Sequence, residues 1–173
     1  MPGEIPPVAQ DRGATLHGLS FVVDPPDVQT PVLRSVLDYW KEKRQERPLP
    51  RRSDIDPLEL KPYLRQLFLI DVLPGAEFRY RLIGSEITER YGRNSTGKTV
   101  HEVYAAIPEI ARWLTTMLLA VVGAARPVLA VGPLTAIGKA HIFSESLHLP
   151  LADSSGGVGT IFGAARYTRL SPR

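Results

Sequence analysis

The sequence predicts an α+β domain built on an antiparallel sheet. Three observations predict this class: a pair of strand-like segments at 67–72 and 78–83, a strongly amphipathic helix at 108–122, and three further strand-like segments between 126 and 167. Strands grouped on either side of a helical middle are typical of antiparallel sheets, because the strands of a parallel sheet alternate with helices along the chain. One face of such a sheet must be covered, and the 108–122 helix is the expected cover.

The composition is that of an ordinary globular domain. The chain has 173 residues, of which 43% are hydrophobic and 23% are charged, and a chain of this length can bury a real core. It has no cysteine, which excludes disulfides, cysteine nucleophiles and cysteinyl cofactor adducts. The formal net charge of +3 permits a nucleic-acid partner without implying one. Because no signal peptide or membrane-length apolar segment is visible, we expect a cytoplasmic protein with no membrane contact.

The N-terminal part divides into a tail and a helix. Residues 1–27 are rich in proline and poor in apolar side chains, so we expect a disordered tail there. A helix is expected to begin at Thr30 and Pro31, because threonine is a good N-cap and proline is favoured at the first helical position. We expect the apolar stripe of this helix to pack on the sheet or on a second copy of the chain, as a dimer interface made of Leu33, Val36, Leu37 and Trp40.

The middle of the chain alternates short elements with turns. The segment 53–60 has the pattern of a short helix. The segment 78–83 alternates apolar and polar side chains with the period of two that is typical of a half-buried strand. The turn residues between 73 and 77 then join 67–72 and 78–83 into an antiparallel hairpin. A short helix at 86–91 and a turn at 101–104 lead into the long helix at 108–122, which ends at Gly123.

The strand at 140–149 has two clearly different faces. One face carries Ser144, Ser146 and His148 together with Ile142. The other carries Glu145 between apolar neighbours, and we expect this face to lie under the 108–122 helix. A buried carboxylate must be paired or protonated, because desolvation penalises its charge. Two partners for Glu145 stay open: an amine or hydroxyl of a ligand, and the side chain of His141 on the same face.

Four stretches of the chain carry a resemblance to a known family. They are LDYWKEKRQERPLPRRSDIDPLEL at 37–60, the hairpin segment at 64–98, the helix at 108–122 and ESLHLPL at 145–151. Together they resemble the alphaproteobacterial family of single-domain PAS proteins. The resemblance implies a PAS fold at 67–170, with a five-stranded antiparallel sheet of strand order 2-1-5-4-3 covered on one face by helices. Residues 28–66 then form an N-terminal helical extension and linker.

The resemblance also bears on ligands and cofactors. Family members that bind haem use a histidine on the central helix, where this chain has none, and flavin photoreceptors of the family use a cysteine. We therefore expect no metal, haem or flavin, with haem on His101 or His141 as a weaker alternative. An unidentified small molecule remains compatible with the sequence. The candidate pocket residues between sheet and helix are Phe78, Tyr80, Ile110, Leu114, Met117, Phe143 and Glu145. These side chains either wall a ligand pocket or simply fill the core.

The expected function follows from the resemblance. It implies a non-catalytic bacterial sensory or regulatory protein that signals through small-molecule binding, protein–protein contacts, or both. The alternative is a ligand-free interaction adaptor whose core is filled by side chains. A small-molecule hydrolase is the weakest reading, because serines 144 and 146 and the histidines lack a G-x-S-x-G elbow and a placed acid. The basic run KEKRQERPLPRR at 41–52 lacks interleaved aromatics, so we expect protein partners and no nucleic acid.

Overall fold

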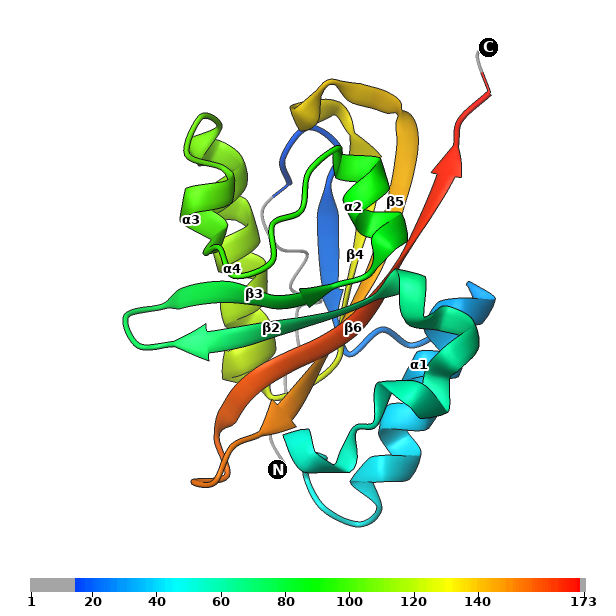
Figure 1. The fold of residues 1–173 in the computed structure, drawn as a ribbon, viewed down its shortest axis with the longest axis vertical. Helices are drawn as coiled ribbons and strands as arrows, with labels where there is room; N and C mark the ends of the chain where they lie inside the picture. The colour runs from blue at the N-terminus through cyan, green and yellow to red at the C-terminus, as the bar shows by residue number, and fades with distance from the viewer. Residues whose placement is uncertain (1–14, 172–173) are drawn as a thin grey trace, which may run out of the picture.

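A computed structural model describes residues 15–171 and contains one antiparallel sheet of six strands. The strand order across the sheet is β1-β4-β5-β6-β2-β3 (Figure 1). With β1 set aside, the order of the other five is the one that the family resemblance implies. The strands are β1 (Ser20–Val23), β2 (Leu67–Leu73), β3 (Glu77–Ile83), β4 (Val128–Leu134), β5 (Lys139–Ala152) and β6 (Val158–Arg169).

The helices predicted to begin at residue 31 and to span 86–91 and 108–122 lie where the sequence places them, within a few residues. The helix predicted at 53–60 is instead two 3-10 segments that run on to Gln66, and the short helix Thr135–Ile137 was not predicted. The two long ones are α1 and α4, and the shorter ones connect the strands. Among the described residues, no helix is both long and apolar enough to cross a membrane. The helices are α1 (Pro31–Arg44), η1 (Arg52–Asp54), η2 (Pro57–Gln66), α2 (Ser85–Tyr91), α3 (Val100–Val103), α4 (Pro108–Ala124) and η3 (Thr135–Ile137).

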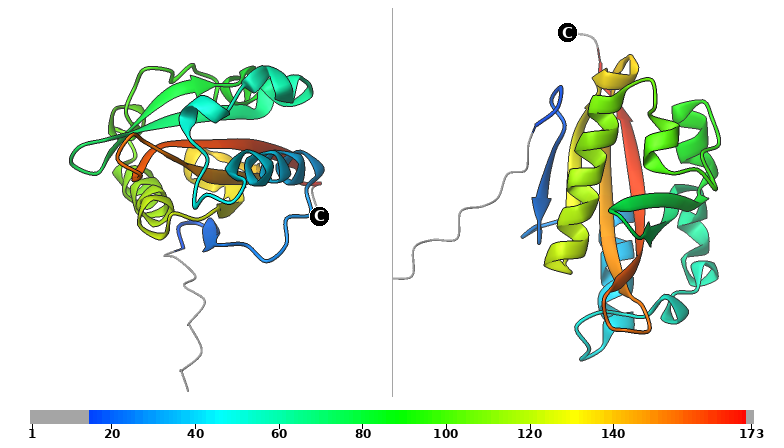
Figure 2. Two further views of the ribbon diagram at one scale, coloured as in Figure 1. Left: turned by 90° about the horizontal axis from the view of Figure 1, so that it is seen from below. Right: turned by 90° about the vertical axis from the view of Figure 1, so that its left-hand side faces the viewer.

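Both faces of the sheet are covered, so the expectation of one covered face is wrong. Helices α4 and α1 lie on opposite sides of the sheet (Figures 1 and 2). We call the side under α4 the α4 face; its buried sheet residues include Phe21, Phe68, Ile70, Phe78, Val128, Ala130 and Ile161. We call the side under α1 the α1 face; its buried sheet residues include Leu67, Leu69, Leu147, Leu149, Leu151, Phe162 and Ala164.

The stripe predicted on the first helix packs against the sheet of its own chain. Leu33 and Val36 are completely buried, and Leu37 and Trp40 are nearly so. The indole N–H of Trp40 donates to the backbone carbonyl of Pro150 at 2.9 Å. Of the two packings that the sequence leaves open for this stripe, the structure has the one on the sheet. The stripe itself therefore offers no exposed surface for a second copy.

Polar contacts fix the other side of α1 to the segment that follows it. The Tyr39 hydroxyl accepts from the backbone N–H of Asp56 at 2.9 Å and donates to Glu59 at 2.6 Å. Lys43 pairs with the same Glu59 carboxylate at 2.7 Å. The segment RRSDIDPLEL at 51–60 thus contacts α1 through polar groups and helps to hold this helix on the sheet.

Part of the segment that the sequence predicts to be a disordered tail forms a strand. Residues 1–14 lie outside the described part of the chain, but Ser20–Val23 form β1 and pair with β4. The Phe21 ring packs edge-on against Trp113 of α4, with 5.9 Å between ring centroids. The backbone at Gly18 lies close to β4, and this approach requires a glycine at position 132. The φ of Gly132 is +147°, and a Cβ there would lie 2.5 Å from the carbonyl oxygen of Gly18. The four-residue strand was missed because it is short and lies between polar and proline-rich segments.

Candidate functional site

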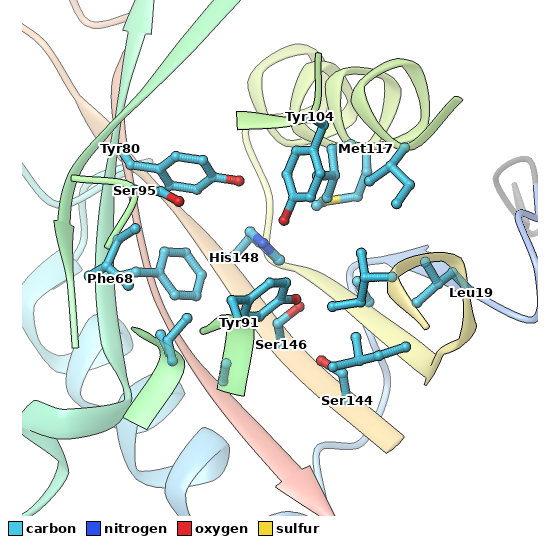
Figure 3. A pocket seen from close by; sticks show the side chains of 18 of the residues that line it. Leu19, Phe68, Tyr80, Tyr91, Ser95, Tyr104, Met117, Ser144, Ser146 and His148 are labelled. Carbon is cyan, nitrogen blue, oxygen red and sulfur yellow. The ribbon is translucent and has the colours of Figure 1, made fainter. Parts of the chain in front are cut away.

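A cavity of about 130 Å³ lies between the α4 face of the sheet and the helices α2 and α4. Figure 3 shows side chains from several elements pointing into it. Each element contributes because its period turns one face inward: α4 does so at helical spacing, and β5 does so at every second residue. The walls thus come from segments that are far apart in the sequence.

Aromatic rings make up a large part of the cavity wall. Four tyrosines reach it, from β3, α2, the end of α3 and β6, and the Phe68 ring joins them from β2. Burial is the main cause that raises the pKa of Tyr80, Tyr91, Tyr104 and Tyr167. All four phenols therefore keep their protons at neutral pH and act as neutral hydrogen-bonding groups.

The polar groups of the cavity floor come from one face of β5. Ser144, Ser146 and His148 alternate there and all line the cavity. His148 is 5% exposed, and its Nδ1 has no hydrogen-bond partner among the described residues. Burial lowers the pKa of His148 to about 4, against weaker opposing contacts with the backbone of Val128 and Ser146. The imidazole is therefore neutral at physiological pH.

A glycine on the neighbouring strand sets the position of the His148 ring. Gly163 of β6 lies directly opposite His148, and a Cβ at Gly163 would come within 2.5 Å of the Phe68 ring. Without that side chain, the Phe68 ring lies 5.0 Å from the imidazole, centroid to centroid. The imidazole is thus held between strands and aromatic neighbours at the cavity wall.

The described wall of the cavity carries a single positive charge. Arg93 is the charged residue among the described lining side chains, and its guanidinium lies over the Tyr104 ring at 5.4 Å. Within that described set of lining residues, none is acidic. The described chain also holds no cluster of three or more potential metal ligands. The site is suited to neutral chemistry.

The structure brings together four of the seven residues predicted for the pocket. Tyr80, Ile110, Leu114 and Met117 line the cavity. Phe78 is buried in the same core cluster without reaching the cavity wall.

Phe143 and Glu145 lie on the opposite side of the sheet, so their predicted position under the 108–122 helix is wrong. The Thr30 hydroxyl donates to Glu145 Oε1 at 2.8 Å, at the start of α1. The alternation along 140–149 was assigned correctly, but it defines two faces without saying which helix covers which. Because both faces are covered, the apolar run beside Glu145 did not mark the cavity.

Sequence reasoning missed the tyrosines at 91, 104 and 167 and the polar face of β5 as site residues. One signal for them was present. In a strand of a sheet that helices cover on both faces, serine, serine and histidine at alternating positions indicate a polar site inside the protein. That signal becomes readable only once both sheet faces are known to be covered.

The comparisons with known proteins place the chain in a family. The model of the PAS domain family matches residues 28–166, so the chain belongs to this family. The match is to the PAS domain family as a whole and does not distinguish the alphaproteobacterial subgroup that the sequence resembles.

A solved structure agrees with this chain at the level of the fold. The PAS domain of BvgS from Bordetella pertussis is 22% identical, with a TM-score of 0.50, over 69% of this chain and 90% of that chain. An RNA-binding light-oxygen-voltage receptor is 12% identical, with a TM-score of 0.47, over 89% of this chain and 39% of its own. No curated protein matches the chain in sequence.

Proposed function

We propose that the chain is a non-catalytic sensory or regulatory protein that binds a small molecule in the α4-face cavity and signals to protein partners. The observation that carries this proposal is a cavity of about 130 Å³ with a neutral, unpartnered imidazole nitrogen at its wall. Family membership supports the sensory role, since PAS domains typically act in sensing and signalling. The setting we propose is the bacterial cytoplasm, with no nucleic-acid or membrane partner.

The chemistry of the cavity supports a binding role over a catalytic one. A serine hydrolase needs a histidine base that is oriented by an acid, and the described lining residues include no carboxylate. A histidine whose pKa is lowered to about 4 is also a weak base. Ser146 and His148 therefore have the character of hydrogen-bonding groups for a bound molecule.

The signal requires two packings that the ligand binds differently. Helix α4 and strand β1 are well placed to report on the cavity, because Leu19, beside β1, and Met117 of α4 both line it. If the chain forms a homodimer, it does so through a surface other than the buried stripe of α1. Light scattering of the purified chain measures its oligomeric state.

A cavity-filling substitution tests the proposal. Ala130 lines the cavity and is 5% exposed, whereas Ala140 is exposed at the start of β5. Native mass spectrometry and melting scans with a library of small molecules identify compounds that raise Tm. We expect Ala130→Leu to abolish those shifts and Ala140→Leu to keep them, with Ala130→Val as a milder variant if leucine prevents folding.

The opposite result identifies the adaptor. If no compound binds the wild type and Ala130→Leu simply raises Tm by filling space, the cavity has no ligand and the protein acts through its surface alone.

A further inference from the structure

The imidazole of His148 is only weakly hydrogen-bonded within the protein, through contacts with the backbone of Val128 and Ser146. A neutral imidazole has one donor nitrogen and one acceptor nitrogen, and a buried nitrogen without a partner costs free energy. Nδ1 is such a nitrogen among the described residues, in a side chain that is 5% exposed. The ring belongs to the cavity wall (Figure 3), but Nδ1 itself is covered. A rotation of the imidazole therefore has to accompany binding if a hydroxyl in the cavity is to reach Nδ1.

The size and lining of the cavity define the size and the aromatic character of the molecule that it can hold. Its volume of about 130 Å³ is close to that of the roughly 150 Å³ engineered cavity that accepts benzene in another protein. The rings of Phe68, Tyr80, Tyr91 and Tyr104 point into the space around it (Figure 3). Aromatic side chains favour an aromatic guest through edge-to-face and offset contacts. One six-membered ring with one or two substituent atoms fits these limits.

The charges around the cavity define the charge state of the molecule that it can hold. A charged guest needs an opposite charge or many donors to offset desolvation. The guanidinium of Arg93 is exposed and already stacks on the Tyr104 ring, and the four phenols are neutral. An uncharged guest meets no such penalty.

The geometry points to a phenol as the ligand: an uncharged, single-ring aromatic compound whose hydroxyl hydrogen-bonds to His148 beside Ser144 and Ser146. This inference rests on the proposed ligand-binding function and names the class of ligand. A hydroxyl both donates and accepts, so it can pair with the imidazole in either tautomer and use a serine hydroxyl as its second partner. The hydrocarbon of the same shape leaves the imidazole unpaired.

Three probe compounds and two matched histidine variants test the assignment. Calorimetric titration at neutral pH compares phenol, toluene and benzoate. The variants are His148→Leu in the cavity and His141→Leu, which removes an exposed histidine from the other face of the same strand. We expect wild type and His141→Leu to bind phenol at least tenfold more tightly than toluene, and not to bind benzoate. We expect His148→Leu to bind toluene and phenol equally.

Each other outcome has a defined meaning. Equal binding of phenol and toluene by the wild type, or benzoate binding as tight as phenol, overturns the assigned ligand class while the ligand-binding function stands. Unchanged phenol preference in His148→Leu removes His148 from the site. Toluene binding by His148→Leu shows that this variant keeps its cavity; if it fails to fold, His148→Phe replaces it, because phenylalanine keeps a ring without a hydrogen-bonding nitrogen, and the same loss of phenol preference is expected. If none of the probes and no compound of the wider library binds, both proposals fall.

Discussion

The two faces of the sheet use the same strands for different purposes. Under α1, the strand β5 presents Leu147 and Leu149, which are completely buried against apolar side chains. Under α4, the same strand presents Ser146 and His148 to a cavity. One apolar face and one polar, hollow face thus differ by a shift of one residue along β5. The contrast shows how a PAS sheet separates its scaffold from its site.

The faces also differ in how their helices are held. Helix α1 is fixed by close packing, by the Trp40 hydrogen bond and by ion pairs such as Lys43–Glu59 at 2.7 Å. Helix α4 packs over a space that side chains do not fill. We therefore expect rigidity on the α1 face and ligand-dependent packing on the α4 face.

The largest loss of stability should follow from removing a buried side chain between α1 and the sheet. Trp40→Ala removes a nearly buried indole and its hydrogen bond to Pro150, and such truncations cost about 3–5 kcal/mol. Urea denaturation measures the loss in the free energy of unfolding. Trp40→Phe keeps a ring and should lose about 1–2 kcal/mol, mainly through the unpaired Pro150 carbonyl. An alanine variant as stable as wild type would mean that α1 is only loosely attached.

The α4 face should make stability depend on pH. The pKa of His148 is about 4 in the folded chain and about 6.5 unfolded, so the unfolded state binds the extra proton between these values. The free energy of unfolding contributed by this site is therefore complete above pH 6.5 and falls as pH drops toward 4, by about 3 kcal/mol in total. The tyrosines around His148 keep their protons throughout this window, because burial raises their pKa.

Matched variants isolate that contribution from other titrating groups. The difference between wild type and His148→Leu should change with pH across the window. His141→Leu, which removes an exposed histidine from the same strand, is the control for the loss of a histidine. Parallel pH profiles for wild type and His148→Leu would show that the imidazole is not desolvated.

The smallest effect should come from Glu145 on the α1 face. Glu145→Gln weakens its contact with Thr30, which is partly exposed, so we expect a loss of about 1 kcal/mol or less. It should leave any ligand-induced shift in Tm unchanged, whereas Ser146→Ala, one residue along on the cavity face, should reduce it. Thermal melts with phenol compare the two, and the reverse pattern would exchange the roles of the two faces.

The sequence predicted the elements better than their arrangement around the sheet. The stripe from Leu33 to Trp40 marked α1 because its spacing is helical, and the alternation at 140–149 marked β5. Neither pattern says which helix covers which face, so Glu145 was placed under the wrong helix. His148 was read as part of an uncovered face, and its burial depends on Gly163 and Phe68, which come from other strands.

Methyl NMR tests the division of the two faces most directly. Met117 lines the cavity under α4, while Leu33 and Leu147 are completely buried under α1. A titration of the chain labelled at methionine and leucine methyls with phenol should shift the Met117 signal strongly. Contacts from the ring protons of phenol to the Met117 methyl should appear in the same experiment, and the Leu33 and Leu147 signals should stay in place. Shifts of those leucines with Met117 unmoved would contradict the assignment of the ligand site to the α4 face.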